Sequence, residues 1–532
     1  MSLKNAAGLR TRTRAVFMAI AAIAALGVVL VGLASSASAA SPSLPDPTRT
    51  GSLDIHKFKA PDSPTGLPNN GTVQDTTGLT PVPGVTFSIQ KVGGIDLTTN
   101  QGWQDASALS GVFNPANASG SITGAGYTLT AASGSPVTTN ASGDASLAGL
   151  PLGLYLVTET AYPTGTTPSA PFLVSVPLTN PADQSTWLYD VNVYPKNSID
   201  NVSKTVEDAN AVKLGDPVTW TIKGDIPNVK TIDGYKIVDQ LDPKLDYVGT
   251  TVTLADGTAI TQGTDYDVVF DSATNTVTVQ FTAAGRLVLA AHPATQVVVK
   301  IDTKVNAVGE IVNTALLYPN AASFNVQPGN PGGPPVTPPV ITKWGSMTVQ
   351  KVDENGAALS GAQFSVYPTE ADAKAGTNAI TLGGQTVFAV DANGQVTISG
   401  LRYSDWANGV AVAPGDAGYQ TYWLAEVKAP TGYELLAQPV EFTITAESSK
   451  PGVDLRITNL PNQVSPGCAE AVRSSGTPTS DCNDNGGGHS PFLPQTGGPA
   501  FLALVAGLVL VAGGALFVTA ARRRGDAPSS LR

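Results

Sequence analysis

The 532-residue sequence predicts an all-β protein made of three tandem immunoglobulin-like β-sandwich domains. Turn formers are abundant, with Gly 55 and Pro 40, whereas only 13% of the residues are charged, which disfavours a helical protein. Short runs of alternating apolar and polar residues recur, as in antiparallel strands with one buried face. These runs are 218–222, 276–281, 297–301, 347–352, 440–444 and 455–458.

The charge balance excludes some classes of function. The formal net charge is 30 − 41 = −11, and without the two chain ends it becomes 22 − 40 = −18. Such an acidic body repels phosphate backbones, so we expect no nucleic-acid partner. His56, His292 and His489 lack partners at ligand spacing, and no catalytic motif appears. We therefore expect no metal, no cofactor and no enzymatic activity.

Residues 1–40 are expected to be a secretory signal peptide. A basic segment ending at Arg14 precedes an apolar run from Ala15 to about Leu33, and Ala37-Ser38-Ala39 is a small-residue cleavage site. A retained membrane anchor is the alternative, and the small-residue ending favours removal. The mature chain then begins near Ala40 and is exported.

The C-terminal residues 493–532 combine three signals in a fixed order. A pentapeptide is followed by an apolar stretch from Pro499 to Ala521, long enough to span a bilayer, and then by a basic tail. This order resembles the cell-wall sorting signal of Gram-positive surface proteins. The resemblance implies that a sortase cysteine attacks the Thr496 carbonyl and passes the acyl group to an amine; a plain membrane anchor is the alternative. The pentapeptide is Leu493, Pro494, Gln495, Thr496 and Gly497.

Composition divides the remaining chain into domains and connecting segments. The first domain carries a Gly-, Ser-, Ala- and Thr-rich insertion around 105–145, and a Pro/Gly-rich connector, expected to be extended, follows the second domain. A polar, Gly-rich spacer follows the third domain. The boundaries are 41–198, 199–327 and 344–462 for the domains, 328–343 for the connector and 463–492 for the spacer.

Polar residues occur on the apolar faces of strands in the second and third domains. Lys204 alternates with Val202 and Val206, and Asp239 and Asn313 occupy similar positions in later strands. In the third domain, the same pattern places Lys351, Glu426 and Asn459 on buried faces. Unpaired burial disfavours the charged forms of both lysines and carboxyls.

Such a triad permits covalent chemistry. A neutral lysine amine is a nucleophile, and a protonated acid can polarise the carbonyl of an asparagine side chain. Attack and loss of ammonia would leave an isopeptide bond between the first and last strands of a domain. The alternative is a buried salt bridge, or a lysine whose amine reaches out to solvent.

Two further motifs connect the chain to a known family. Residues 422–433, YWLAEVKAPTGY, look like the E-box of Gram-positive pilins, with Glu426 as its acid. Residues 187–196, WLYDVNVYPK, look like their pilin motif, with Lys196 as its linking lysine. With the sorting signal, these motifs identify the chain as similar to the major shaft subunit of sortase-assembled fimbriae, especially the three-domain actinobacterial kind.

The resemblance implies a fold and a set of bonds. The outer domains would be Cna B-type sandwiches and the middle domain Cna A-type. The internal isopeptides would be Lys204–Asn313, promoted by Asp239, and Lys351–Asn459, promoted by Glu426.

The first domain departs from this pattern. Lys57 lies on a buried face, and Glu159 sits in a second sequence that looks like an E-box. However, the closing strand ends at Pro195, where an asparagine would be needed, and Asn197 lies beyond that proline. We therefore expect no isopeptide bond in this domain.

The expected function is a structural subunit of a covalent pilus, joined by a pilus-specific sortase from Thr496 to Lys196 of the next subunit and supporting adhesion. A monomeric wall-anchored adhesin with a Cna-type stalk is the alternative. Further expected partners are a housekeeping sortase, peptidoglycan and a minor or tip pilin. The precursor would pass through the membrane before wall attachment at the cell surface.

A disulfide between Cys468 and Cys482 is expected in the spacer. These are the only two cysteines of an exported chain, and they lie in a Gly-rich segment where the required geometry is easily met. Two free thiols, or pairing between molecules, are the alternatives.

Overall fold

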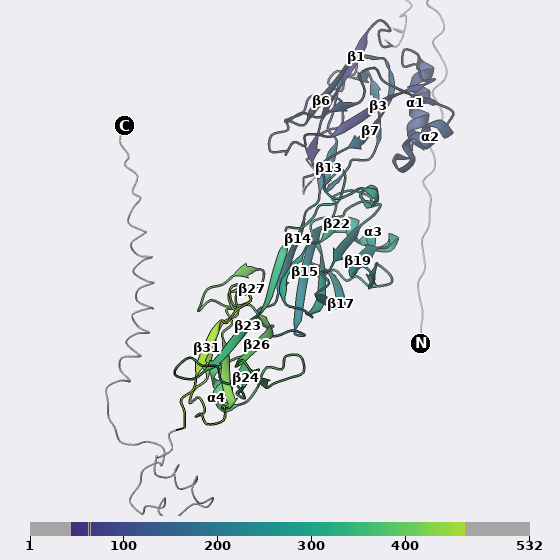
Figure 1. Cartoon of the computed structure of the whole chain (residues 1–532). Helices are drawn as coiled ribbons and strands as arrows, with labels where there is room; N and C mark the ends of the chain where they lie inside the picture. The colour runs from purple at the N-terminus through teal and green to yellow at the C-terminus, as the bar shows by residue number, and fades with distance from the viewer. Residues whose placement is uncertain (1–43, 62, 64, 463–532) are drawn as a thin grey trace, which may run out of the picture.

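The computed structural model describes residues 44–61, 63 and 65–462. It shows three β-sandwich domains following one another along an elongated molecule (Figure 1). The all-β prediction is confirmed, and each of the six predicted runs contains a strand. Alternation in 276–281 predicts Val277, Val279 and Phe281 as its inner face, and each of them is 1% exposed.

The first domain packs a five-stranded sheet, β4-β3-β7-β9 with β5 also paired to β3, opposite a three-stranded sheet, β12-β1-β6. A small sheet, β2-β13-β8, lies at the end that faces the second domain (Figure 1). The strands are β1 (Thr50–His56), β2 (Phe58–Lys59), β3 (Thr86–Gly93), β4 (Thr128–Ala131), β5 (Val137–Thr138), β6 (Asp144–Pro151), β7 (Gly153–Ala161), β8 (Thr166–Thr167), β9 (Phe172–Val176), β10 (Leu178–Thr179), β11 (Trp187–Leu188), β12 (Asp190–Val193) and β13 (Lys196–Ile199).

The small-residue insertion contains helices that its composition does not indicate. These are α1 (Asn100–Val112), η1 (Pro115–Asn117) and α2 (Ala118–Gly124), on one side of the domain (Figure 1). The Thr99 side chain caps α1 by accepting a hydrogen bond from the Gly102 backbone N–H. Only Gly102, Ala106 and Leu109 of α1 are buried, so the apolar signal of this helix is weak.

The second domain consists of two four-stranded sheets, β14-β15-β20-β17 and β18-β19-β16-β22. Its core is continuous between the sheets, and Trp220 is fully buried in it. The elements are β14 (Val202–Glu207), β15 (Pro217–Asp225), β16 (Lys236–Gln240), β17 (Leu245–Leu254), β18 (Tyr266–Asp271), β19 (Thr276–Phe281), α3 (Ala283–Ala291), β20 (Gln296–Val305), β21 (Gly309–Asn313), β22 (Leu316–Tyr318) and η2 (Ala322–Asn325).

The third domain packs the sheet β25-β24-β29-β30 against a sheet in which β23 pairs with β26 and β31. Its elements are β23 (Val340–Val352), β24 (Gln363–Tyr367), α4 (Glu370–Ala375), β25 (Phe388–Ala389), β26 (Gln395–Arg402), β27 (Trp406–Ala407), β28 (Val410–Ala411), β29 (Tyr422–Lys428), β30 (Val440–Phe442) and β31 (Leu455–Thr458).

The second and third domains share a strand. Residues 340–344 of β23 pair antiparallel with β21 of the second domain, and residues 344–350 pair with β26 of the third. Beside this strand, the fully buried Arg402 donates hydrogen bonds only to backbone carbonyls, among them Ala211 O at 2.9 Å and Gly418 O at 2.8 Å. The two domains are therefore joined by backbone pairing and by a buried guanidinium.

The Pro/Gly-rich segment 328–343 is not the extended connector that composition suggests. Its last residues already belong to β23, and its earlier part lies against the first domain, where the Gly165 N–H donates to Gly333 O at 3.0 Å. Thr337 N also donates to Ala315 O at 2.9 Å. Proline and glycine here shape a loop that folds back, which composition alone does not distinguish from a linker.

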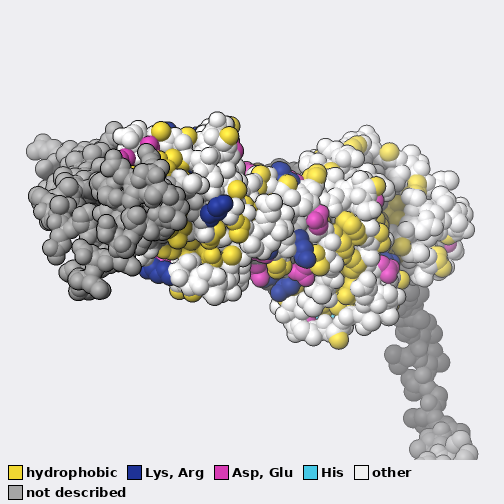
Figure 2. Space-filling model, turned by 60° about the horizontal axis from the view of Figure 1, so that its bottom comes forward, with side chains coloured by type: hydrophobic (Ala, Val, Ile, Leu, Met, Phe, Trp, Pro, Cys, Tyr) yellow, Lys and Arg dark blue, Asp and Glu magenta, His cyan; other side chains and the backbone are white. Residues whose placement is uncertain are grey.

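Figure 2 shows one face of the molecule, where Lys and Arg side chains are few and several of them lie near Asp and Glu side chains. Hydrophobic side chains are scattered among uncharged polar ones on this face. Within the described part of the chain, no helix is long and apolar enough to cross a membrane. The predicted signal peptide and membrane span lie outside the described residues.

Candidate functional site

The third domain brings Lys351, Glu426 and Asn459 together in its core. Strands β23 and β31 run parallel, with Lys351 opposite Ile457, and β29 of the facing sheet supplies Glu426. The Lys351 Nζ donates to Asn459 Oδ1 at 2.5 Å, and Asn459 Nδ2 donates to both Glu426 oxygens at 2.9 Å. Burial lowers the pKa of Lys351 to about 8. The amine therefore lies beside the amide that it would attack.

The second domain assembles the same residue types from β14, β16 and β21. Lys204 Nζ donates to Asp239 Oδ2 at 2.5 Å, and Asn313 Nδ2 lies 3.5 Å from the same oxygen. Burial lowers the pKa of Lys204 to about 8 and raises the pKa of Asp239. Both shifts favour the neutral amine and the neutral acid, the pair that the proposed chemistry requires.

The second triad is less completely hydrogen-bonded than the third. Among the described residues, the Asp239 Oδ1 and Asn313 Oδ1 atoms are buried without a hydrogen-bond partner. Orphaned buried oxygens are costly, and a proton on the carboxyl would let Asp239 donate to the asparagine oxygen. The two orphaned atoms are thus the acid and the carbonyl that the reaction would pair.

The first domain also assembles a triad, which corrects the geometric expectation made from its sequence. Lys57 Nζ contacts Glu159 Oε1, and Asn197 Nδ2 donates to Glu159 Oε2 at 2.7 Å. Lys57 and Asn197 are fully buried, and the Glu159 side chain is 2% exposed. Burial lowers the pKa of Lys57 to about 8, against the opposing effect of Glu159.

Asn197 reaches this position because the chain resumes a strand after Pro195. Strand β13 pairs parallel with β2, placing Asn197 opposite Lys59 and its side chain inside the domain. The alternation that predicts inward and outward residues holds only up to the proline. After the proline, the pairing of β13 with β2 decides which side chains point inward, and these two strands are far apart in the sequence.

Lys196, the expected linking residue, begins strand β13. It is half-buried, its Nζ donates to Tyr194 O at 3.4 Å, and burial lowers its pKa. The alternation before Pro195 predicts an open amine at a sheet edge, but β13 lies between β2 and β8, and Lys196 itself pairs with Phe58. Its neighbour Asn197 points inward, so the lysine side chain lies on the other face of the strand.

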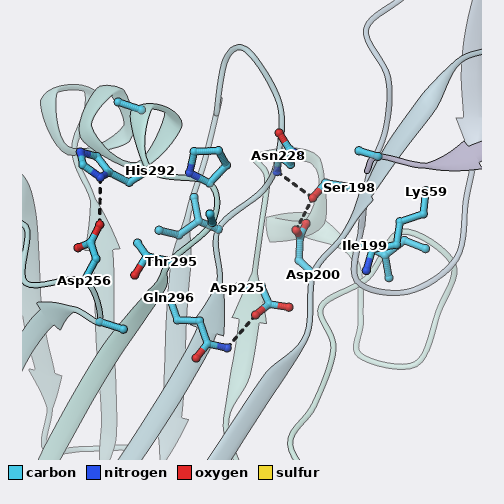
Figure 3. Close-up of a pocket in the computed structure, with 16 residues that line it drawn as sticks. Lys59, Ser198, Ile199, Asp200, Asp225, Asn228, Asp256, His292, Thr295 and Gln296 are labelled. Atoms are coloured by element: carbon cyan, nitrogen blue, oxygen red, sulfur yellow. Dashed lines mark hydrogen bonds and ion pairs between the residues drawn. The ribbon is translucent and has the colours of Figure 1, made fainter. Parts of the chain in front are cut away.

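Beyond β13, a groove of about 750 Å³, lined by both polar and apolar side chains, lies between the first and second domains. Figure 3 shows its hydrogen-bond chain, in which Asn228 N donates to Ser198 Oγ at 2.9 Å and Ser198 Oγ donates to Asp200 Oδ1 at 2.6 Å. Burial raises the pKa of Asp200 to about 7. On the far side of the groove, His292 Nδ1 lies 3.0 Å from Asp256 Oδ2.

Several predicted residues lie outside the described part of the chain. They are the sorting motif Leu493, Pro494, Gln495, Thr496 and Gly497 and the two cysteines Cys468 and Cys482. Within the described residues, no group of three or more His, Cys, Asp or Glu is arranged to hold a metal ion.

One residue that contacts a triad is not indicated by the sequence. Ser169 lies between β8 and β9, where its backbone N–H donates to Asn197 Oδ1 at 2.7 Å. Its Oγ lies 3.2 Å from Lys57 Nζ and donates to Glu159. The flanking Pro168 and Pro171 mark a turn, but nothing in the pattern links that turn to Lys57.

Three family profiles match successive parts of the chain. Residues 48–198 match the Gram-positive pilin subunit D1, N-terminal domain. Residues 198–315 match the Sgo0707 N2 domain, and residues 345–459 match a prealbumin-like fold domain.

Two characterised relatives are similar over most of the chain. Fimbrial subunit type 1 of Actinomyces viscosus is 32% identical over 526 residues, which covers 90% of this chain and 92% of that protein. Fimbrial subunit type 2 of Actinomyces naeslundii is 34% identical over 421 residues, covering 73% and 78%, respectively.

Two solved structures share the arrangement. The full-length major pilin SpaD of Corynebacterium diphtheriae superposes with a TM-score of 0.60 at 29% identity, covering 79% of this chain and 99% of that one. The major pilin SpaA of the same organism gives a TM-score of 0.55 at 26% identity, covering 77% and 100%. For SpaA, the solved structure points to a modular pilus assembly with stabilising isopeptide bonds.

Proposed function

Because the chain belongs to the family of Gram-positive fimbrial subunits, we propose that its copies are joined head to tail through Lys196 and Thr496. The protein is a structural subunit of a fimbrial shaft at the cell surface. The observation that carries this conclusion is the similarity to fimbrial subunit type 1 along 90% of the chain. The monomeric adhesin considered from the sequence is not favoured.

In the proposed linkage, a pilus sortase cleaves after Thr496 and transfers its carbonyl to the Lys196 amine of the next subunit. The half-buried position of Lys196 supports this role, because partial desolvation lowers its pKa and increases the fraction of neutral amine. The sortase complex would supply the remaining deprotonation and the orientation. A housekeeping sortase would attach the last subunit to peptidoglycan, and a minor or tip pilin would complete the fibre.

The test is the high-mass ladder in wall extracts boiled in detergent. Lys196→Ala should abolish the ladder, and Lys196→Arg should fail equally because a guanidinium stays protonated. Lys59→Ala is the matched control, since Lys59 is exposed on the strand paired with β13, and its ladder should persist. A persistent ladder in both Lys196 variants, cross-linked at another lysine, would exclude Lys196 as the acceptor.

We also propose internal isopeptide bonds Lys204–Asn313 and Lys351–Asn459. In each, the neutral Nζ attacks Cγ of the asparagine, the bond from Cγ to Nδ2 breaks, and Nδ2 leaves as ammonia. Asp239 or Glu426 takes the lysine proton and returns one to the leaving nitrogen. The contacts of these groups and the lowered pKa values of both lysines support the reaction.

Intact mass of the mature chain measures these bonds, because each one removes one ammonia molecule. Asp239→Asn and Glu426→Gln keep the side-chain shape but remove the acid. Each variant should therefore leave its own bond unformed, and its mass deficit should be smaller by one ammonia. Glu434→Gln is the control for the third domain, since only its backbone oxygen contacts Asn459. Full sequence mass in the folded wild-type protein would exclude both bonds.

A Cys468–Cys482 disulfide is the remaining proposal from the sequence. Closing a loop of about fifteen residues would contribute roughly 3 kcal/mol in the chain-entropy model. Alkylation of the native, unreduced protein should leave both cysteines unmodified. Modification of either one would exclude the bond.

A further inference from the structure

Among the described contacts, the triad of the first domain differs from the other two in having a backbone N–H that donates to the side-chain oxygen of its asparagine. The backbone N–H of Ser169 points at Asn197 Oδ1 and lies 2.7 Å from it, while the Ser169 hydroxyl contacts both Lys57 and Glu159. In the third domain, the described partner of Asn459 Oδ1 is the lysine itself. In the second, Asn313 Oδ1 has no partner among the described residues.

These contacts place a donor where negative charge would develop. When a lysine amine adds to an amide carbon, the carbonyl oxygen becomes an oxyanion, and a preorganised backbone N–H stabilises it. The Ser169 N–H already donates to that oxygen in the folded protein. The serine hydroxyl lies between the amine and the carboxyl, so it can accept a proton from one and pass a proton to the other.

Glu159 connects the two reacting groups. One of its oxygens contacts Lys57 Nζ and the other accepts a hydrogen bond from Asn197 Nδ2, which would be the leaving nitrogen. Desolvation of Lys57 favours its neutral form, and the nearby positive Lys196 acts in the same direction. A static salt bridge would account for the contact of Lys57 with Glu159, but it does not require a backbone donor on the asparagine oxygen.

We propose that Ser169 is a catalytic residue for a third internal bond, Lys57–Asn197, in the first domain. The inference rests on the amide chemistry proposed above for the other two domains. The neutral Lys57 Nζ attacks Asn197 Cγ and, as the new bond forms, passes one proton to Glu159, directly or through Ser169 Oγ. The Ser169 N–H holds the oxyanion, the bond from Cγ to Nδ2 breaks, and Glu159 returns the proton as ammonia leaves. One amide replaces another, with no oxidant or cofactor.

The test follows bond formation in the mature chain made by cell-free synthesis. Samples taken over time are digested, and the cross-linked peptides of all three domains are quantified. Ser169→Ala keeps the N–H and removes the hydroxyl, and should slow the Lys57–Asn197 bond roughly tenfold, a modest acid–base effect because Lys57 also contacts Glu159 directly. Ser169→Pro removes the N–H and should slow it about 100-fold or more. Ser169→Thr keeps both groups and should restore the rate.

The other two bonds serve as internal controls, because they are distant from Ser169. Wild-type protein that forms Lys204–Asn313 and Lys351–Asn459 but never Lys57–Asn197 would overturn this inference and leave the shaft function and its chemistry intact. Unchanged rates in Ser169→Ala and Ser169→Pro would show that the bond forms without Ser169. If Ser169→Pro fails to fold, the comparison of Ser169→Ala with Ser169→Thr decides. Loss of all three bonds in wild-type protein would instead contradict the chemistry of the whole chain.

Discussion

The second and third domains share strand β23, whereas the first and second meet through loop contacts beside an open groove. At the shared strand, Arg402 is fully buried and its donors are taken up by carbonyls of both domains. At the groove, hydrogen bonds run through Ser198 and Asp200, and the walls mix polar and apolar side chains. One junction is therefore fixed by a shared strand, and the other by loop hydrogen bonds, such as those of Gly165 with Gly333 and of Asn320 with Thr166, beside the groove.

The two junctions differ in how freely the domains that they join can move. Two domains joined by a continuous strand cannot reorient without breaking ladder hydrogen bonds. The first and second domains share no strand, so small movements there need break only individual loop hydrogen bonds, and the groove keeps the strand that carries Lys196 near solvent. We expect substitutions at the shared strand to cost more stability than substitutions at the groove.

The largest effect is expected from Arg402→Ala. The change removes the guanidinium and the hydrogen bonds that it donates to one buried and four partly buried carbonyls, so the free energy of unfolding of the second and third domains should fall by about 4 kcal/mol. Denaturant midpoints of the mature chain measure this loss. Arg456→Ala is the control, because Arg456 is exposed on β31, and it should change stability by less than about 0.5 kcal/mol. A loss below about 1 kcal/mol in Arg402→Ala would show that the cage of carbonyls around Arg402 does not fix the junction.

The groove should respond to pH through Asp200. The pKa of Asp200 is raised to about 7 in the folded protein, so the folded state binds this proton more tightly than the unfolded state, where the pKa is about 3.8. The stability that this proton contributes is fully present below about pH 3.8 and is lost as pH rises through about 7. Between pH 5 and pH 8, the free energy of unfolding for the transition that includes the first domain should fall by about 2.5 kcal/mol. Asp200→Asn should remove this component. An equal pH dependence in the variant would assign it to other groups.

A smaller effect at the shared strand is expected from Asn408. Its Oδ1 accepts hydrogen bonds from the N–H groups of Asp208 and Ala209 at 3.1 Å, and its φ is +52°. Asn408→Ala should cost about 2 kcal/mol, and Asn408→Gly about 1 kcal/mol less than that, because glycine adopts this φ freely. Thermal unfolding of the two variants separates the backbone effect from the hydrogen bonds. Equal losses would mean that the left-handed backbone is not strained.

The smallest effect is expected for the ion pair of Asp256 and His292 at the groove. Both side chains are about one-third exposed, so His292→Gln should change stability by less than about 0.5 kcal/mol. Denaturant midpoints at low salt provide the measurement. A loss above about 1 kcal/mol would show that the groove holds the two domains more firmly than its polarity indicates.

The sequence predicted the features that depend on local alternation. Lys204 and Lys351 share faces with valines two residues away, so their burial could be predicted from strand periodicity. The strands themselves were found for the same reason. These predictions need only the pattern within one strand.

Features that depend on pairing between distant segments could not be predicted this way. Asn197 is buried because β13 pairs with β2, about 140 residues earlier, and no pattern around Pro195 indicates this partner. The contact of Gly333 with Gly165 is of the same kind. The burial of Arg402 follows from the approach of two domains, whereas an isolated arginine near a strand end normally indicates a solvated position.

Strand β23 also determines how a fibre of these subunits would carry tension. With the proposed Lys204–Asn313 and Lys351–Asn459 bonds closed, a pull between Lys196 and Thr496 bypasses most of both sandwiches and enters the five residue pairs that join β21 to β23. Because these strands are antiparallel and pulled from opposite ends, the pairs are sheared together rather than unzipped one by one. If they give way, the load passes to residues 314–339, which could extend to about 90 Å once β22 detaches from β16, while the covalent backbone of the fibre stays unbroken.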